Sequence, residues 1–372
     1  MKIGIDAKWY FNGPVSGRIF IQNVLKELIA LRHDIEWHIF LNAGNKENEF
    51  PFVADNIKVH FARARFNLIS NLFVIPKLAK QLKLDAVFFQ TFSPKENSFK
   101  SVVFIHDVLF KNYPQFFTWK EKLYFQPLKW TIRNADRIAT TTNFVRHQLI
   151  QFNYTKRNQP VDLAPSGVTS IFRPLNSHDQ DFVLRVKNKF DLPTDYLLVV
   201  GRLNARKNVE TLIRSLPLIN DKEIQLVIVG EENWKAPNLK SIEKNKQLTS
   251  RIKFTGFVTD EELSAIYAMA RIFCFPSFAE GFGLPPLEAM ASGIPVAVSN
   301  TTSMPEVCDK AAIYFDPNRA EEIAVSINSL LENKSLYEQK RNEGLEWSKN
   351  YTWKRTAEGI LQSIISAIQT PS

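Results

Sequence analysis

Cysteine is nearly absent from this sequence, with only Cys274 and Cys308 among 372 residues. Two thiols in apolar surroundings make neither a disulfide framework nor a thiolate metal cluster. The sequence also lacks an apolar run of the roughly 20 residues that a membrane-spanning helix requires. No basic and then apolar leader precedes the first predicted strand. We therefore expect a soluble, cytoplasmic protein.

Acidic side chains are outnumbered, with 38 Asp and Glu against 47 Lys and Arg and a net charge of +9. This excess favours anionic partners, such as phosphorylated substrates or acidic lipid surfaces. No nucleic-acid recognition motif accompanies it, so we expect no nucleic-acid partner. Apolar residues at 45% and charged residues at 23% are ordinary globular values, which excludes a disordered or collagen-like chain.

Short apolar runs alternate with longer amphipathic segments. Runs such as Tyr196–Gly201 lack the period-2 polarity of a one-sided sheet and are typical of parallel strands covered on both faces. Helical periodicity fills the gaps, as in Asp260–Met269, where Thr259 and Glu262 predict a capping box. The predicted strands are Lys2–Asp6, Ile35–Leu41, Ile57–Ala62, Leu84–Gln90, Ser101–His106, Ala135–Thr141, Val161–Ala164, Tyr196–Gly201, Ile224–Gly230, Arg251–Phe257, Ile272–Pro276, Ile294–Ser299 and Ala311–Phe315.

The turn-rich stretch Ser166–Gln180 interrupts this alternation and marks a domain boundary. We predict an α/β protein with two doubly wound, Rossmann-like domains, residues 1–174 and 175–350, facing each other across a cleft. A terminal helix in residues 351–372 crosses back to the first domain. Ligands of open α/β sheets bind beyond the carboxyl ends of the strands, so the loops there are the candidate sites.

The loop after the strand that ends at Pro276 contains Gly281 and Gly283, which let backbone amides approach a ligand. A helix then starts at Pro285 or Pro286, and its first N–H groups form an anion site.

Two carboxylates flank this helix start. We place Glu288 in the first helical turn, where it can accept hydrogen bonds from a ribose diol, and Glu280 on the loop, where it can do the same for a sugar. Taken singly, each is a solvated charge or a complement to the helix dipole; the joint pattern favours a ligand site.

A second cluster, GRLNARKN, runs from Gly201 to Asn208 after a buried strand. Gly201 permits a tight exit, and Arg202 and Lys207 place two cations where they suit a pyrophosphate. Basic loops are equally often exposed to solvent without a ligand, so this cluster alone does not decide between phosphate binding and a solvated loop. Gly230 ends the next strand, where the backbone can pack near a nucleotide base.

These motifs resemble the retaining glycosyltransferase family 4, of the GT-B fold, and within it bacterial mannosyltransferase-like members. Glu280 and Glu288 match the family's E-x7-E motif, and Arg202 and Lys207 match its donor-phosphate pair. The resemblance covers nearly the whole chain. The segments that carry it are GRLNARKN, VIVGE, FTGFVTDEEL, FPSFAEGFGLPPLEAMASGIPVAVSN with MPEV after it, KIGIDAKWYFNGPVSG and FIHDVLFKNYPQFF.

The resemblance implies that Arg202 and Lys207 hold the nucleotide diphosphate, that Glu288 binds the ribose, and that Glu280 and His106 lie at the donor sugar. It assigns catalysis to His106, Arg202, Lys207 and Glu280, and donor binding to Gly13, Gly17, Gly201, Gly230, Phe282, Gly283, Leu284 and Glu288. After Gly17 the chain reads Arg-Ile-Phe-Ile, where relatives often keep a second glycine.

The implied reaction moves a sugar from a nucleotide-diphosphate donor, GDP-mannose as first choice or a UDP-sugar, to a glycan or lipid-linked acceptor in surface polysaccharide or lipopolysaccharide synthesis. We expect no cofactor and no metal, because no D-x-D pair follows a strand and fixed cations can replace the ion. A nucleotide-sugar epimerase or hydrolase of the same fold, and a non-catalytic nucleotide-sugar or glycan binder, stay as alternatives.

Two other enzyme classes are disfavoured. Gly13 and Gly17 do not form the G-x-G-x-x-G of a dinucleotide oxidoreductase. A retaining glycosidase needs two carboxyls about 5 Å apart across the scissile bond, whereas Glu280 and Glu288 belong to a loop and a helix beside a predicted phosphate site.

Two segments, Phe61–Lys83 and Lys111–Arg137, interleave cations with aromatic residues. Basic aromatic surfaces suit peripheral contact with an anionic membrane at its inner face, where a lipid-linked acceptor lies. Helices that pack their aromatic residues on the core and expose lysines give the same pattern. Both interpretations stay open.

Overall fold

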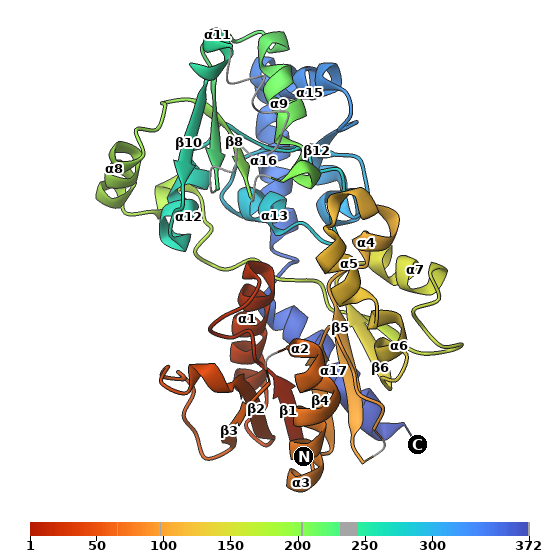
Figure 1. Cartoon of the computed structure of the whole chain (residues 1–372). Helices are drawn as coiled ribbons and strands as arrows, with labels where there is room; N and C mark the ends of the chain where they lie inside the picture. Colours follow the sequence, from red (N-terminus) through yellow and green to blue (C-terminus); the bar gives the residue numbers. More distant parts are fainter. Residues whose placement is uncertain (65, 97, 202–203, 231–244, 371–372) are drawn as a thin grey trace. The chain divides into compact units, whose positions relative to one another are not determined.

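The computed structural model describes residues 1–64, 66–96, 98–201, 204–230 and 245–370 (Figure 1). The chain divides into two compact units, unit 1 with Met1–Gly167 and Trp353–Ser372, and unit 2 with Val168–Thr352. The sequence placed these boundaries after residues 174 and 350, whereas the structure has them after Gly167 and Thr352. None of the described helices is long and apolar enough to cross a bilayer.

Unit 1 is built on seven parallel strands in the order β3-β2-β1-β4-β5-β6-β7. They are β1 (Lys2–Asp6), β2 (Glu36–Asn42), β3 (Ile57–Ala62), β4 (Ala86–Gln90), β5 (Lys100–Ile105), β6 (Arg137–Thr140) and β7 (Val161–Leu163). Its helices are α1 (Val15–Leu31), α2 (Asn67–Ile69), the π-helical turn η2 (Ser70–Val74), α3 (Ile75–Leu82), α4 (Leu109–Asn112), α5 (Trp119–Phe125), α6 (Leu128–Ile132), α7 (Asn143–Gln151) and α17 (Trp353–Gln369), with 3₁₀ turns η1 (Ala43–Asn45) and η3 (Pro114–Phe116).

Helices cover both faces of this sheet, as continuous apolar strands require. Apolar side chains of α1 and α17 pack on one face, where Phe20 lies 4.2 Å from Phe104 between ring centroids. Side chains of α3, α6 and α7 pack on the other face.

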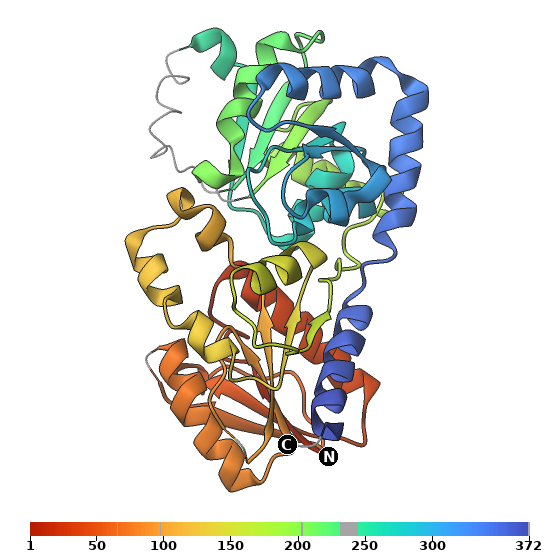
Figure 2. The same ribbon diagram turned by 90° about the vertical axis from the view of Figure 1, so that its right-hand side faces the viewer.

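The terminal helix α17 belongs to unit 1, where Thr356 Oγ1 donates a hydrogen bond to the carbonyl of Pro165 at 2.6 Å. Figure 2 shows α17, in blue, beside the strands of unit 1.

Unit 2 holds six parallel strands in the order β10-β9-β8-β11-β12-β13. They are β8 (Tyr196–Val200), β9 (Gln225–Val229), β10 (Ile252–Gly256), β11 (Ile272–Phe275), β12 (Val296–Ser299) and β13 (Ala312–Phe315). Its helices are α8 (Gln180–Lys189), α9 (Val209–Ser215), α11 (Lys246–Thr249), α12 (Asp260–Met269), α13 (Leu284–Ala291), α14 (Met304–Cys308), α15 (Ala320–Glu332) and α16 (Lys334–Ser348), with 3₁₀ turns η4 (Leu175–Ser177), η5 (Ala205–Lys207), η6 (Leu216–Leu218) and η7 (Asp309–Ala311).

The predicted doubly wound class is confirmed, since both sheets are parallel and each predicted strand is present. In unit 2, α9 and α15 pack on one face, and α12 and α13 pack on the other. The predicted capping box is also confirmed, because Thr259 and Glu262 exchange hydrogen bonds at the start of α12.

The strand order reverses at one place in each sheet, between β1 and β4 in unit 1 and between β8 and β11 in unit 2. At such a reversal the loops leave the sheet in opposite directions and open a crevice at the carboxyl ends of the strands, where open α/β sheets bind ligands. We call these two places the switch points.

Candidate functional site

Two loops meet at the switch point of unit 2, one after β8 and one after β11. Asn208 ties them together, because its side-chain amide donates to the carbonyls of Pro276, at 3.0 Å, and Pro317, at 2.7 Å. Its backbone adopts the left-handed conformation, with φ of 52°, which asparagine tolerates better than most residues. Both predicted motifs are thereby held side by side.

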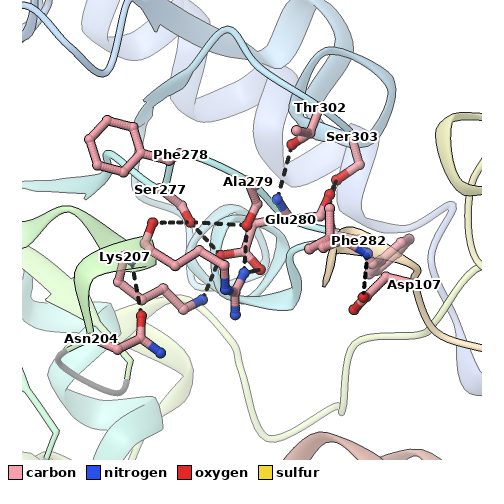
Figure 3. A network of polar contacts seen from close by, with 12 residues as sticks. Asp107, Asn204, Lys207, Ser277, Phe278, Ala279, Glu280, Phe282, Thr302 and Ser303 are labelled. Atoms are coloured by element: carbon pink, nitrogen blue, oxygen red, sulfur yellow. Dashed lines mark hydrogen bonds and ion pairs between the residues drawn. The ribbon is translucent and has the colours of Figure 1, made fainter. Parts of the chain in front are cut away.

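Glu280 lies at the centre of this junction (Figure 3). Its Oε1 is 2.8 Å from Lys207 Nζ, and its Oε2 is 2.8 Å from a guanidinium nitrogen of Arg206. Ser277 Oγ donates to Oε1 at 2.5 Å. Burial by itself raises the pKa of Glu280, but the charges of Lys207 and Arg206 and these hydrogen bonds outweigh it and lower the pKa to about 2.

The side chain of Lys207 is 14% exposed, and its Nζ lies 4.6 Å from the centroid of the Phe275 ring. Burial lowers the pKa of Lys207, and the attraction of Glu280 opposes that shift. The carboxylate and the aromatic face therefore hold a cation in place at the end of the sheet, where it can meet the negative charge of a ligand without further rearrangement.

The backbone around Glu280 is fixed from the next loop. The N–H of Glu280 donates to Thr302 Oγ1 at 3.0 Å, and Ser303 Oγ lies 2.9 Å from the carbonyl oxygens of both Glu280 and Phe282, which share its one hydroxyl hydrogen (Figure 3). The loop is therefore preorganised along its length.

Gly283 is the N-cap of α13, with φ of 100°. This left-handed backbone favours glycine, and a Cβ there would also displace Cε of Met304, 2.3 Å away. Because Pro285 and Pro286 have no N–H, the amides that open the helix belong to Gly283 and Leu284.

Glu288 was predicted in the first turn of α13 but lies in the second turn. The helix has no acidic residue in its first turn, because Gly283 sets its start at Leu284. Tyr267 Oη donates to Glu288 Oε2 at 3.0 Å. Burial raises the pKa of Glu288 to about 7, although the Tyr267 hydrogen bond acts to lower it. The site therefore pairs a firmly ionised carboxylate with one that titrates near neutrality.

Gly201 and Gly230, which were predicted to bind the nucleotide-sugar donor, lie where β8 and β9 end. Gly201 and Gly230 have φ of 141° and 148°, and a Cβ on Gly230 would lie 2.4 Å from the carbonyl oxygen of Gly201. The close approach of these two strand ends thus accounts for Gly230. Arg202 lies outside the described residues.

The remaining predicted residues belong to unit 1. His106 follows β5, its ring packs edge-on against Phe20 and Phe104, and its buried Nε2 has no hydrogen-bond partner among the described residues. Burial lowers the pKa of His106 to about 4, so the imidazole is neutral at pH 7.

Gly17, predicted to lie on the first loop, lies in the first turn of α1. A Cβ on Gly13 or Gly17 would lie 2.8 Å or 2.6 Å from the indole of Trp9. Both positions make room for that ring.

Sequence reasoning missed Arg206, Ser277 and Tyr267. Arg206 directly precedes Lys207 in the GRLNARKN segment, so its charge and position could have been recognised from the sequence. Ser277 lies within the quoted FPSFAEGFG segment, three residues before Glu280, whereas Tyr267 contacts Glu288 from α12, outside the quoted motifs. No group of three His, Cys, Asp or Glu side chains suited to a metal ion occurs in the part of the chain that the structure describes.

The chain is similar to known glycosyltransferases over both units. Residues 18–170 match the family described as Glycosyltransferase Family 4, and residues 181–347 match Glycosyl transferases group 1. The chain is 31% identical over 261 residues to the O-antigen chain mannosyltransferase B of Escherichia coli, which is 68% of this chain and 67% of that protein. This chain therefore belongs to the family 4 glycosyltransferases.

Other relatives are similar over smaller shares of their length. The chain is 28% identical over 242 residues to the serotype-specific mannosyltransferase WbdA of Escherichia coli, covering 63% of this chain and 29% of WbdA. Among solved structures, sucrose-phosphate synthase from Thermosynechococcus elongatus has a TM-score of 0.75 at 17% identity, covering 97% of this chain and 98% of that one. WaaG, a glycosyltransferase involved in lipopolysaccharide biosynthesis, has a TM-score of 0.71 at 13% identity, covering 98% and 99%. These structures share the GT-B fold with this chain.

Proposed function

We propose that this glycosyltransferase moves a hexosyl group, mannose as first choice, from a nucleotide-diphosphate sugar to a glycan or lipid-linked acceptor during surface polysaccharide or lipopolysaccharide synthesis. The observation that carries the proposal is the buried Glu280 carboxylate, held by Lys207 and Arg206 where β8 and β11 end. This arrangement offers fixed positive charge and a sugar-binding oxygen at one place.

The acceptor capacity of Glu280 supports its role as a sugar ligand. A carboxylate offers about four lone-pair positions. Lys207 and Ser277 occupy two on Oε1, and Arg206 occupies one on Oε2. One position on Oε2 is left for a donor-sugar hydroxyl.

Charge stabilisation at the leaving group is the main catalytic contribution in this proposal. The C1–phosphate bond of the donor breaks as the acceptor oxygen bonds to C1 on the same face. The acceptor proton passes to the departing diphosphate, and the configuration at C1 is retained. Lys207, with Arg202 from the sequence motif, stabilises the charge that develops on that diphosphate. The proposed reaction uses no cofactor and no metal, since these cations do the electrostatic work.

The choice of mannose rests on the relatives. Besides the O-antigen enzymes, the chain is 28% identical over 238 residues to a GDP-mannose-dependent phosphatidylinositol dimannoside mannosyltransferase of Mycobacterium tuberculosis, covering 63% of this chain and 58% of that protein. We therefore propose GDP-mannose as the donor, with a UDP-sugar as the alternative.

A thermal-shift panel of GDP, UDP and their sugars tests the proposed donor. Ligand at 100 times its dissociation constant adds about 2.7 kcal/mol of stability, so the correct nucleotide raises the melting temperature clearly. A shift with GDP and GDP-mannose but not with UDP is the expected result. A shift with UDP alone contradicts the mannose assignment, and no shift with any nucleotide contradicts the proposed function.

The basic aromatic segments of unit 1 support a peripheral membrane contact. Phe73 is 66% exposed on η2, and Trp119 and Trp130 are 70% and 61% exposed on α5 and α6. These side chains are therefore not packed in the hydrophobic core. We define the basic aromatic patch by its exposed apolar residues Phe66, Ile69, Phe73, Trp119, Leu123 and Trp130 and its exposed cations Arg63, Lys77, Lys80, Lys83, Lys120, Lys122, Lys129 and Arg133.

The two halves of the patch lie together. Asn67 Nδ2 is 3.4 Å from Tyr124 Oη, and Figure 2 shows the orange α2–α3 segment and the golden α5–α6 segment along the same side of unit 1. Glu121 is the one acidic residue in the helices α3, α5 and α6. Its carboxylate forms a capping box with Thr118. We propose that the patch rests on an anionic membrane at its inner face, close to a lipid-linked acceptor.

A further inference from the structure

Three consecutive residues after β12 direct their hydroxyls to the loop that carries Glu280. Thr301 Oγ1 donates to the carbonyl of Phe278 at 3.0 Å. Thr302 Oγ1 accepts from the N–H of Glu280 at 3.0 Å, and Ser303 Oγ lies 2.9 Å from the carbonyl oxygen of Glu280 (Figure 3). We call these three residues the hydroxyl triplet.

Consecutive side chains do not share a direction in regular secondary structure. They alternate between the two faces of a strand and point around the axis of a helix, so neither conformation presents three adjacent hydroxyls to one loop. The triplet forms a β-turn instead, in which the N–H of Met304 donates to the carbonyl of Thr301 at 3.1 Å. This turn is what brings all three hydroxyls to the same loop.

The turn places Thr302 in an unfavourable backbone conformation. Thr302 has φ of 55°, and Ser303, the next residue, has φ of −83° and ψ of −10°. A positive φ at the first central residue alone is typical of the type II′ turn, where glycine is the usual residue. Most described residues other than glycine with positive φ are Asn or Asp, whereas Thr302 is β-branched, which makes the conformation rarer still.

The strain at Thr302 has no explanation in the stability of the turn. Glycine would adopt this conformation freely, but it would leave the N–H of Glu280 without its acceptor. Strain of this kind costs at least about as much free energy as one hydrogen bond contributes. Strained residues concentrate at binding sites, where they maintain a geometry, and the group held here is the backbone from which the Glu280 carboxylate projects.

We propose that Thr302 is a positioning residue for Glu280: its hydroxyl holds the Glu280 N–H so that the carboxylate meets a hydroxyl of the donor sugar, although the turn is strained as a result. This inference rests on the proposed function, because it takes Glu280 as the ligand of the donor sugar. It predicts that stability and donor binding respond differently to the same substitutions.

Thr302→Ala and Thr302→Gly separate the hydroxyl from the strain. Both variants lose the hydroxyl, but only Thr302→Gly loses the Cβ that makes a positive φ unfavourable. Thr302→Gly should therefore melt at a higher temperature than Thr302→Ala, although glycine is the less stabilising residue where φ is negative. Both variants should bind GDP-mannose about three- to tenfold more weakly than the wild type, as loss of one hydrogen bond predicts. Calorimetry measures the affinity, and a thermal melt measures the stability.

Free GDP and two further variants are the controls. The affinity for GDP should change much less than that for GDP-mannose, because GDP has no sugar for Glu280 to bind. Thr302→Ser keeps the hydroxyl and should bind GDP-mannose as the wild type does. Asp309 also has a positive φ in unit 2, of 43°, so Asp309→Gly should relieve strain without changing either affinity. If the wild type binds uridine nucleotides instead, UDP and a UDP-sugar replace the guanosine pair.

Three results overturn the inference. Thr302→Ala binds GDP-mannose as tightly as the wild type, or the affinities for GDP-mannose and GDP fall equally, or the affinity for GDP-mannose follows the melting temperature across the variants, as a merely structural role predicts. Each can occur while the wild type still binds nucleotides, in which case the proposed function stands and only the role of Thr302 fails. A wild type that binds no nucleotide contradicts the proposed function itself.

Discussion

Lys207 Nζ and Glu280 Oε1 lie 2.8 Å apart at the end of the unit 2 sheet, although the two residues are 73 positions apart in the chain. Neither side chain can be assigned a role alone. Glu280 keeps Lys207 charged and in place despite its burial, and Lys207 keeps Glu280 ionised, so the pair acts as one electrostatic unit.

Replacing Lys207 removes the fixed charge from this unit. We expect Lys207→Ala to lower turnover at saturating donor by about 10²-fold or more, as loss of a charge-stabilising group does. Arg202→Ala should behave likewise. Lys253 is the control, because it pairs with the exposed Asp191, and Lys253→Ala should turn over normally. Near-wild-type turnover for Lys207→Ala and Arg202→Ala removes the diphosphate assignment.

Replacing Glu288 and replacing Glu280 should weaken the binding of different ligands. Glu288→Gln loses charge-assisted hydrogen bonds to the ribose, worth about 1.5–3 kcal/mol, so binding of free GDP or UDP should weaken by roughly ten- to a hundredfold. Glu280→Gln should weaken binding of the sugar-bearing donor more than binding of the free nucleotide, because the free nucleotide lacks the sugar that Glu280 contacts and is affected only through Lys207. Calorimetry distinguishes the two. Unchanged nucleotide affinity with abolished transfer in Glu288→Gln would favour a carboxylate-centred mechanism instead.

Donor affinity should depend on pH through Glu288. Its pKa is raised to about 7, and a ribose diol donates to the ionised form, so binding favours loss of the proton. Affinity should be constant well above pH 7, fall by at most about tenfold for each pH unit below it, and level off near the affinity of Glu288→Gln. A nucleotide sugar is the right ligand, because a free diphosphate itself titrates with a second pKa of about 6.

Replacing Tyr267 should shift the midpoint of this pH profile in a predictable direction. Its hydrogen bond acts to lower the pKa of Glu288, so Tyr267→Phe should move the midpoint to higher pH, while Glu288→Gln should abolish the dependence. A midpoint unmoved by Tyr267→Phe assigns the titration to another group.

Most of the fold could be predicted from the sequence because strands buried on both faces leave a continuous apolar run, as in YLLVV and IQLVIV. The site was less accessible. Glu280 and Lys207 were identified singly, but their pairing arises only when the loops after β8 and β11 meet. Gly17 carried the signal of a flexible loop, whereas it lies in α1 against Trp9, a contact that no local pattern encodes.

The basic aromatic patch predicts binding to anionic vesicles. The wild type should sediment with phosphatidylglycerol-containing vesicles and much less with pure phosphatidylcholine, and high salt should weaken the binding. Phe73→Ser with Trp119→Ser should reduce it strongly. Val325→Ser, at a 67% exposed apolar position of unit 2, should not. Equal binding by the double variant and the wild type contradicts the proposed membrane contact.

The anomeric configuration of the transfer product tests the central claim most directly. The protein is incubated with GDP-mannose, an α-linked donor, and a mannoside acceptor in excess EDTA, and the product is followed by NMR. We expect GDP to form only when acceptor is present, together with an α-linked mannoside, which demonstrates retention without a metal. A β-linked product, free mannose or an epimerised nucleotide sugar formed without acceptor, activity lost in EDTA and restored by magnesium or manganese, or bound donor that is never consumed would each contradict it.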